Sequence, residues 1–436
     1  MTSLLIAAVL FASGASAQTP RAADSTDAVK VDAIYPDIEK LYIDLHRNPE
    51  LAFHEQRTAA ALAARLKALG YEVTTGLGGT GVVAILKNGA GPVVMLRTEL
   101  DALPIEEKTG LPFASTVKTK NDAGDDVPVS HMCGHDAHMS AWAGTAELMA
   151  KNRGRWHGTL MLVGQPAEEV VAGAIAMLRD GLFTRFPKPD YALGMHVEHT
   201  LPAGVIGFHP GYFRANSTGL EMTVYGKGGH GAFPQSAIDP VVIAARIVLG
   251  LQTIVSRENN PVDPAVITVG SIHGGSASNI IPEQVKLQIT VRSLDPEVHK
   301  RLLAAIERQA KGEALAANAP KEPLVETKSN TDAVYNDPEL TQRMAAAARA
   351  ELGADRVVEM PAQMGGEDFS QFGLAGVRAV LLHVGAVDAT KLAASRKSGV
   401  PVPGVHSPLW APEREPTIKA AMSAEVAILM DLLGGK

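Results

Sequence analysis

Residues 92–96, Pro-Val-Val-Met-Leu, form a short apolar run that is typical of a buried β-strand. Similar runs and segments with helical spacing of apolar residues lie on both sides of it. The strand candidates are 81–86, 159–163 and 191–197, and the helix candidates are 54–69, 141–150 and 174–178. Short apolar strands that alternate with helices predict an α/β fold, with a largely parallel sheet flanked by helices.

The pattern changes near residue 213. A strand, a helix, two strands and a helix are predicted at 218–225, 240–256, 265–272, 284–293 and 296–316. The first pattern then resumes with a helix, a strand and a helix at 337–352, 378–384 and 415–433. We therefore expect a main domain, 31–212 and 326–436, interrupted by a smaller α/β domain with an antiparallel component at 213–325.

The first 17 residues resemble a secretory signal peptide, with an apolar run that ends in Ala15-Ser16-Ala17. No Lys or Arg precedes this run, so the usual basic n-region is lacking. Residues 18–30 have the composition of a disordered linker. No other segment approaches 18 uninterrupted apolar residues, so we expect no membrane span and an exported protein, periplasmic or secreted.

The length and charge of the chain narrow the possible functions. At 436 residues the chain is too long for one ordinary core, which favours two domains. Its 40 basic and 47 acidic residues give a net charge of −7 without long charge runs. A nucleic-acid-binding protein would need a basic face, so we expect no nucleic-acid partner.

The only cysteine, Cys133, lies within residues 131–138, His-Met-Cys-Gly-His-Asp-Ala-His, the densest group of potential metal ligands in the chain. A single cysteine is more often a small buried apolar residue. In an exported protein it has no internal disulfide partner, whereas a metal would protect its thiolate. The neighbouring histidines, His135 among them, favour the metal-ligand interpretation.

Further candidate ligands follow predicted strands. Asp101 follows one strand, the adjacent carboxylates Glu168 and Glu169 follow another, and His196 lies at the end of a third. The ends of parallel strands meet at one crevice, so these side chains could converge. Mixed sulfur, nitrogen and oxygen ligands suit zinc or a similar ion. Such an ion lowers the pKa of bound water towards ~7, and a nearby carboxylate can take the proton.

Several motifs in order complete this pattern. They are Leu45-His46-Arg47-Asn48-Pro49-Glu50, Asp101-Ala102-Leu103-Pro104, residues 133–138, Gln165-Pro166-Ala167-Glu168-Glu169, Gly228-Gly229-His230, Asn279-Ile280-Ile281-Pro282 and Gly366-Glu367-Asp368-Phe369. From about Leu45 to the C-terminus the chain resembles the hippurate hydrolase-like N-acyl-amino-acid amidohydrolases. These enzymes are a branch of the di-metal aminoacylase–carboxypeptidase superfamily.

The resemblance implies a role for each matching residue. A site for two divalent ions, Zn or Mn with Co or Ni as alternatives, would be formed by Cys133, His135, Glu169, His196 and His406. Glu168 would be the general base, and Asp101 would orient one of the metal ligands without binding the metal itself.

The inserted domain would be the lid and dimerisation domain of a homodimer or higher homo-oligomer. Within it His230 would reach across the dimer to polarise the scissile carbonyl, and Asn279 and Arg292 would hold the free carboxylate of the substrate. The chain departs from the family pattern in 97–101, Arg-Thr-Glu-Leu-Asp, where Glu99 replaces the usual Asp. That change could alter the geometry near the metals.

The expected function is a metal-dependent amidohydrolase that acts on a small molecule. A metal-activated water would cleave N-acyl or N-aroyl amino acids to a carboxylic acid and a free amino acid. One alternative keeps the chemistry but acts on short peptides, as a dipeptidase or carboxypeptidase. Another is a catalytically silent protein that binds amino-acid conjugates, against which the retention of Glu168 argues.

Overall fold

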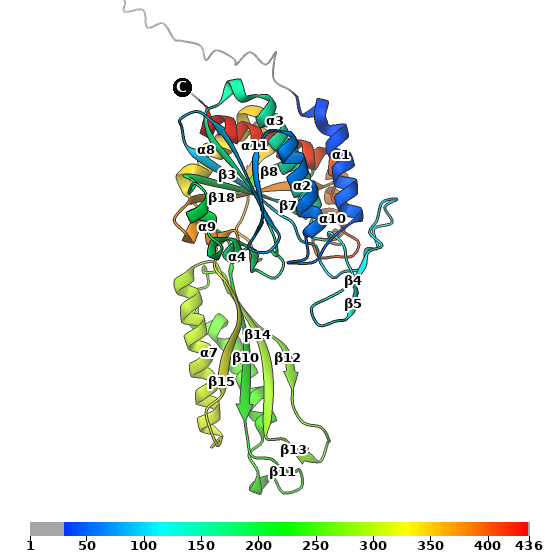
Figure 1. Ribbon diagram of the computed structural model, residues 1–436. Helices are drawn as coiled ribbons and strands as arrows, with labels where there is room; N and C mark the ends of the chain where they lie inside the picture. The colour runs from blue at the N-terminus through cyan, green and yellow to red at the C-terminus, as the bar shows by residue number, and fades with distance from the viewer. Residues whose placement is uncertain (1–29, 435–436) are drawn as a thin grey trace, which may run out of the picture.

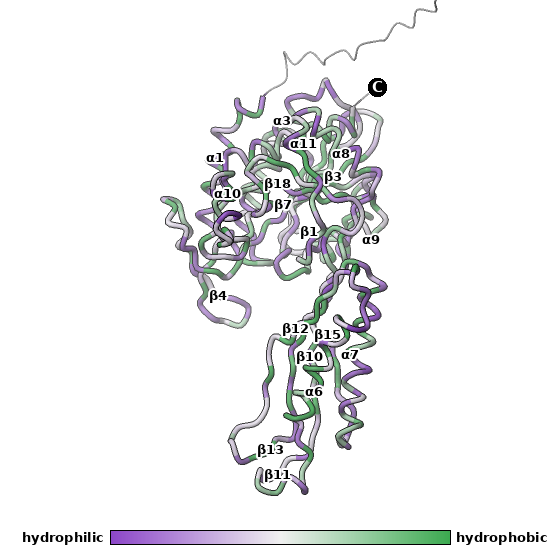
Figure 2. Tube along the Cα trace, turned by 180° about the vertical axis from the view of Figure 1, so that it is seen from behind, coloured by the Kyte–Doolittle hydropathy of each residue, from purple (hydrophilic) through white to green (hydrophobic). Residues whose placement is uncertain are grey.

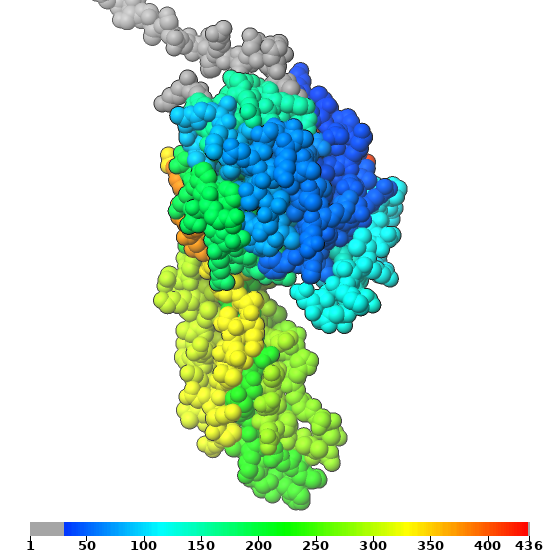
Figure 3. Space-filling model, in the orientation of Figure 1, coloured from blue at the N-terminus to red at the C-terminus, as the bar shows by residue number. Residues whose placement is uncertain are grey.

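The computed structural model describes residues 30–434. The predicted signal peptide, 1–17, and the predicted linker up to residue 29 lie outside the described residues. The chain forms two lobes, a rounded one and an elongated one that projects from it (Figures 1 and 3). The elongated lobe is made by the middle of the sequence, whereas segments from both ends of the sequence build the rounded lobe.

The rounded lobe is built on an eight-stranded sheet with the order β1-β2-β6-β3-β7-β18-β8-β17. Its centre, from β6 to β18, is parallel, and antiparallel pairs occur on both sides of it. The strands are β1 (Glu72–Leu77), β2 (Gly81–Asn88), β3 (Val93–Glu99), β6 (Gly158–Gln165), β7 (Tyr191–Pro202), β8 (Ile206–Phe208), β17 (Val357–Glu359) and β18 (Arg378–Val387). The predicted α/β architecture with a sheet flanked by helices is confirmed.

Both faces of this sheet are buried because alternate residues of each strand point to opposite sides. In β2, Val82 and Ala84 face one hydrophobic core, and Val83 and Ile85 face the other. The first core lies under α1 (Val31–Arg47), α2 (Gln56–Ala68), α3 (His135–Lys151), α8 (Pro338–Leu352) and α11 (Arg414–Leu433). The second lies under α4 (Gly173–Arg179), α5 (Leu182–Arg185) and α9 (Ser370–Leu374).

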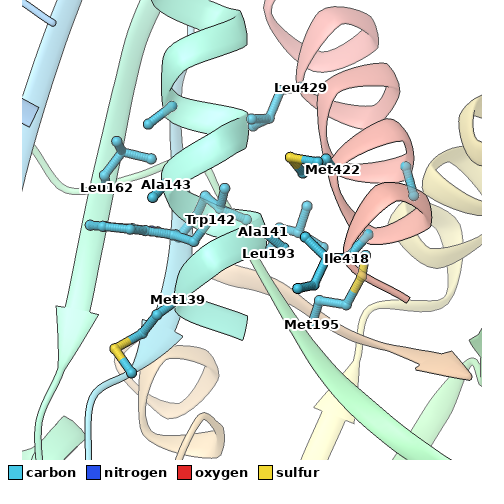
Figure 4. Close-up of a cluster of buried hydrophobic side chains, with 14 of the residues drawn as sticks. Met139, Ala141, Trp142, Ala143, Leu162, Leu193, Met195, Ile418, Met422 and Leu429 are labelled. Atoms are coloured by element: carbon cyan, nitrogen blue, oxygen red, sulfur yellow. The ribbon is translucent and has the colours of Figure 1, made fainter. Parts of the chain in front are cut away.

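The larger core centres on α3, which packs on the sheet beside α11. Trp142 of α3 is 1 % exposed and donates a hydrogen bond from its indole nitrogen to Leu96 O (3.0 Å), so this large side chain is buried without an unpaired donor. Ile418 and Met422 of α11 pack beside it (Figure 4). Hydrophobic residues accordingly concentrate along the central strands and helices in Figure 2. This packing fixes the N-terminus of α3 against the ends of the strands.

The elongated lobe is a four-stranded antiparallel sheet, in the order β12-β14-β10-β15, with two helices on one face. Its elements are β10 (Asn216–Tyr225), α6 (Pro240–Thr253), η3 (Ile254–Glu258), β12 (Ala265–His273), β14 (Gln284–Ser293), α7 (Pro296–Ala316) and β15 (Leu324–Thr331). A small ladder of β11 (Gly229–His230) and β13 (Ile280–Ile281) forms its tip (Figure 1). The second sheet extends to Thr331, beyond the boundary expected at residue 325.

Three Asp-Pro pairs explain where three helices begin. Asp239, Asp295 and Asp337 each accept a hydrogen bond from a backbone N–H of the helix that follows, which satisfies a donor that has no partner within the helix. Proline occupies the first helical position in each case, where its missing N–H costs nothing. The long helix α7 therefore has the bounds that its sequence predicts.

The remaining elements are short. They are β4 (Lys118–Lys120) and β5 (Asp126–Pro128), β9 (Gly211–Arg214) and β16 (Val334–Asn336), and α10 (Ala389–Ser398). The pair β9–β16 joins the two chain segments that run between the lobes. The hairpin β4–β5 projects from the rounded lobe on the side of the elongated one (Figure 3).

One described helix, continuous over Pro240–Glu258, has the length and apolar composition of a membrane span. Ile243, Ile247 and Leu251 of this helix are buried in the core of the elongated lobe. Its apolar character is therefore used, at least on one face, for packing on the sheet.

The buried carboxyl of Glu425 predicts a dependence of stability on pH. Glu425 of α11 accepts a hydrogen bond from Thr145 of α3 (2.6 Å), and burial raises its pKa to about 8. Between about pH 4.5 and 8 the folded protein therefore keeps a proton that the unfolded chain releases, so wild-type stability falls as pH rises. In Glu425→Gln this loss of stability with rising pH should be absent. Between about pH 4.5 and 8 the free energy of unfolding of the variant should therefore gain on the order of 3 kcal/mol over that of wild type.

Thermal unfolding at pH 5 and pH 8 measures this difference, with the exposed Glu106→Gln as the matched control. A difference between Glu425→Gln and wild type that does not change with pH would contradict the assignment.

Candidate metal centre

The candidate ligands lie at the carboxyl ends of the central strands. Asp101 follows β3, Glu168 and Glu169 follow β6, and His196 lies within β7. Since these strands are parallel neighbours, their ends meet at one edge, which is where sites form in open α/β sheets. The structure brings these side chains together, as the sequence predicts.

Cys133 and His135 reach the same edge from the N-terminus of α3. Gly134 between them has φ +81, a left-handed conformation that brings the two side chains round the start of the helix. A Cβ at Gly134 would lie 2.8 Å from atoms of both Trp410 and Val197. Only glycine fits this turn, so the backbone fixes the direction of both ligand side chains.

Besides a group of Glu168, Glu367 and Asp368, the proposed ligands and Glu168 form three overlapping groups, and all the atoms of each group lie within 4.8 Å of one another. The groups are Cys133/His135/His196, Cys133/Glu169/His406 and His135/Glu168/Glu169. The Cys133 Sγ lies 3.5 Å from His196 Nε2. Glu169 lies between two rings, with one oxygen 3.8 Å from His135 Nε2 and the other 3.4 Å from His406 Nε2.

The hydrogen bonds of two histidines leave one ring nitrogen of each directed at the cluster. His135 Nδ1 lies 2.8 Å from Asp101 O and His196 Nδ1 lies 2.7 Å from Val197 O, so both must donate there. In the neutral form of each ring the Nε2 atom then carries the lone pair, as a metal ligand requires. Asp101 also accepts the backbone N–H of Glu169 (2.9 Å), which ties the strand end to the histidine.

The cluster has the properties of a cation site. Asp101 Oδ1, His135 Nε2 and Glu169 Oε1 are buried, and none of them has a hydrogen-bond partner in the described part of the chain. Burial opposes protonation of His135, but the hydrogen bond to Asp101 and the charges of Glu99 and Glu169 raise its pKa to about 10. The raised pKa shows that the carboxylates around His135 favour a positive charge at this place. Thiolate, imidazole and carboxylate donors are ligands that fit one or two divalent ions.

Glu168 and Glu169 lie on a strained turn. Ala167 and Val171, which flank this pair, have φ values of +52 and +55 although neither is glycine. Glu55 holds the turn by accepting the N–H of Ala167 (2.8 Å). Burial, followed by the charges of Glu367 and Glu169, raises the pKa of Glu168 well above its usual range. The turn thus directs a buried, proton-accepting carboxyl at the cluster.

A buried network supports this turn from behind. The guanidinium of Arg97, fully buried, donates to Glu99, to Glu367 (2.8 Å) and to Asp368 (3.0 Å). Asp368 also accepts from the amide of Gln165 (2.7 Å), two residues before the turn begins at Ala167. Glu367 and Asp368 of the motif 366–369 therefore balance the positive charge of Arg97.

Glu99 forms its side-chain hydrogen bonds with Arg97 and His138, and none with a candidate ligand among the described residues. Its second oxygen accepts from His138 Nδ1 (2.9 Å), and His138 Nε2 accepts the backbone N–H of Val197 (2.8 Å). His138 is therefore committed to hydrogen bonds on both ring nitrogens. The extra methylene of Glu99 reaches the cluster only indirectly, through His138 and the backbone beside His196.

The predicted substrate-binding residues are split between two places. His230 and Asn279 lie together at the tip of the elongated lobe, where Gly231 N–H donates to Asn279 O (2.7 Å). In Figure 1 this tip is at the opposite end of the lobe from the sheet that carries the cluster. Arg292, by contrast, lines the cleft beside the cluster and donates to Met364 O (2.7 Å).

Sequence reasoning missed Arg214 and Gln363, which line the same cleft. Arg214 of β9 donates to the amide oxygen of Gln363, and the nitrogen of that amide donates to Glu198. Neither residue lies in a motif, and no periodicity marks them. Only the approach of β9 to the loop after β17 brings them to the site.

Comparison with known proteins agrees with this geometry. The model of peptidase family M20/M25/M40 matches residues 95–400. The chain is 39 % identical to a hippurate hydrolase of Campylobacter jejuni over 284 residues, 64 % of this chain and 70 % of that protein. It is 35 % identical to thermostable carboxypeptidase 2 of Saccharolobus solfataricus over 336 residues, 75 % and 80 % of the two chains. A dinuclear metal-binding peptidase of Bacillus subtilis has the same fold, with a TM-score of 0.75 and 29 % identity over 91 % of this chain and 98 % of that one.

Proposed function

Because this chain belongs to peptidase family M20/M25/M40 and is a metal-dependent amide hydrolase, we propose that it cleaves N-acyl or N-aroyl amino acids with a free α-carboxylate. The products are a carboxylic acid and an amino acid. The observation that carries the proposal is a buried carboxyl, Glu168, between the ligand cluster and a cleft that presents the guanidinium of Arg292. A cation site, a base and an anion-binding group are the parts that this reaction needs.

Cys133, His135, Glu169, His196 and His406 would hold two divalent ions, zinc or manganese, with Asp101 fixing His135. Such ions supply a Lewis acid for the amide oxygen and lower the pKa of water. Glu168 accepts a proton from the attacking water and delivers it to the amide nitrogen as the C–N bond breaks. Its raised pKa suits a group that must both take and give a proton.

A dipeptidase or carboxypeptidase remains the second candidate function. It is supported by the 35 % identity to an enzyme named as a carboxypeptidase. Both substrate classes place a free carboxylate and an amide in the same positions, so the cluster serves either one. The difference lies in the acyl side, where a peptide carries a charged amino group.

Turnover on matched pairs separates the two functions. We expect amino-acid release from N-acetyl- and N-benzoyl-alanine to exceed release from glycyl-alanine by at least about tenfold in kcat/KM. The amino group of the dipeptide is charged and needs an anionic partner in the cleft, whereas a neutral acyl group needs none. The measurement is amine release by metal-loaded protein. Faster cleavage of the dipeptides would select the peptidase function instead.

We further propose that the elongated lobe binds a second copy of this chain. Val242 and Leu249 on the outer face of α6 are 51 % and 71 % exposed, and Val266 and Ile272 on the edge strand β12 are 39 % and 53 % exposed. An apolar helix face beside an open strand edge is suited to a two-fold interface. Such a dimer would also allow the tip of one subunit to approach the cluster of the other.

In such a dimer we expect His230 to act on the partner's substrate. His230→Ala and Glu168→Gln should each be nearly inactive, since one lacks the carbonyl-polarising group and the other the base. In a mixed dimer, the intact Glu168 of one subunit meets the intact His230 of the other. Random mixing of equal amounts should therefore restore about one quarter of the wild-type activity.

The experiment unfolds and refolds the two variants together, or co-expresses them, and measures specific activity. Each variant refolded alone is the control. If the mixture shows only the sum of the separate activities, His230 does not act across the interface.

We also propose an exported location, periplasmic or secreted, which rests on the apolar run and Ala15-Ser16-Ala17 near the start of the sequence. Fractionation of cells that express the full chain would test this. Retention of uncleaved protein in the cytoplasm would contradict it.

A further inference from the structure

The cleft beside the cluster contains two guanidinium groups. It has a volume of about 480 Å³, and the candidate ligands Cys133, Glu169 and His196 line it on the side of the rounded lobe. Arg214, at the end of β9, and Arg292, near the end of β14 in the elongated lobe, line it too. A substrate held at the cluster would therefore lie within reach of two permanent positive charges.

Both arginines are held by the same short loop. Arg214 donates to the side chain of Gln363, and Arg292 donates to the carbonyl of the next residue, Met364 (2.7 Å). Ala215 N–H donates to Gly365 O (3.0 Å), which fixes the chain beside Arg214 against this loop. Consecutive loop residues thus anchor the two guanidinium groups near each other.

Neither positive charge is neutralised directly. The acceptors of both arginines are uncharged amide or carbonyl oxygens, and among residues 30–434 no carboxylate forms an ion pair with either group. The nearest carboxylate in this network, Glu198, is bonded to the far side of the Gln363 amide and to His383 (3.2 Å). The Nε of Arg214 is buried and has no hydrogen-bond partner in the described chain.

A substrate with one carboxylate would bring one negative charge to these two half-buried positive charges and leave one positive charge uncompensated. We propose that the substrate carries two carboxylates, the α-carboxylate held by Arg292 and a second one held by Arg214. The class is an N-acyl amino acid in which either the amino acid is acidic or the acyl group is that of a dicarboxylic acid. This inference rests on the proposed amide hydrolysis and narrows its substrate.

Isosteric substrate pairs test the second charge. We expect kcat/KM for N-acetyl-glutamate over N-acetyl-glutamine, or for N-succinyl-alanine over N-succinamoyl-alanine, to be about tenfold or more. The pair that shows the preference identifies which side of the amide carries the second carboxylate. A ratio near one for both pairs would overturn the inference, although amide hydrolysis itself would stand.

Arg214→Met should reduce the preferred ratio to near one, and Arg214→Lys, which keeps the charge but loses the fork, should leave an intermediate ratio. Arg301→Met, on the exposed surface of α7, is the matched control and should keep the wild-type ratio. A ratio in Arg214→Met equal to that of wild type would contradict the role of Arg214. Wild type and Arg214→Lys provide the test even if the methionine variant folds poorly.

Ligand binding provides a readout that does not need turnover. Calorimetry with metal-loaded protein should give at least about tenfold tighter binding of glutarate than of butyrate, and Arg214→Met should abolish this difference. If no acyl amino acid is hydrolysed but glutarate binding still depends on Arg214, the proposed activity fails and the paired-arginine site stands. Equal binding of glutarate and butyrate by wild type would count against the site itself.

Discussion

Glu168→Gln is expected to lower kcat by about 10²–10⁴-fold, the range that a positioned general base contributes. The amide of glutamine has nearly the same shape as the carboxyl but cannot take a proton from water. Glu168 is 7 % exposed, so bulk solvent does not easily replace it as the proton acceptor. Steady-state kinetics with an N-acyl amino acid, on protein of known metal content, measures the effect.

The metal content should change little in this variant, because Glu168 is the proposed base and is not one of the five residues proposed to hold the ions. Glu425→Gln is the matched control, since it also replaces a buried glutamate with its amide but lies outside the ligand groups. A Glu168→Gln protein with a kcat within threefold of wild type would exclude Glu168 as the base.

Cys133→Ala should remove at least one ion per subunit and lower kcat/KM by at least about 10²-fold. Cys133 belongs to two of the ligand groups, one with His135 and His196 and one with Glu169 and His406. Without a bound cation, burial and the two nearby glutamates raise the pKa of its thiol, so its ionisation depends on the metal. Elemental analysis after extensive dialysis measures the loss.

Cys133→Ser gives a graded comparison, because a hydroxyl is a poorer ligand of about the same size. We expect its metal content to fall between those of wild type and the alanine variant. The fold should persist, since Cys133 is at the edge of the core and its neighbour Gly134 sets the backbone turn. The same metal stoichiometry in the alanine variant and in wild type would refute a ligand role for Cys133.

Much of the fold could be predicted because its signals are local. The strands β2, β3 and β6 are apolar runs, and α7 begins at an Asp-Pro cap and keeps its helical spacing over its whole length. The three-residue strands β8 and β17 could not be predicted, since they are too short to show a period. Their pairing depends on contacts between residues about 150 positions apart in the chain.

The position of the site was also a local inference, since Asp101, Glu168 and His196 each follow or end a strand that the sequence marks clearly. The contacts that each residue makes within the site depend on the direction of its side chain, which the sequence does not give. The sequence does not indicate that Glu99 turns towards Arg97 and His138, or that Arg214 reaches the cleft. It likewise gives no sign that His230 and Asn279 share a tip far along the lobe from Arg292.

Titration of metal-free protein with Zn²⁺ or Mn²⁺, with amino-acid release from N-acyl amino acids followed at each step, tests the account most directly. We predict no release without metal and a rise in activity that ends at two equivalents per subunit, the number of ions proposed for this site. Release that does not depend on the added metal would contradict the account, as would no release from any acyl amino acid when two ions are bound.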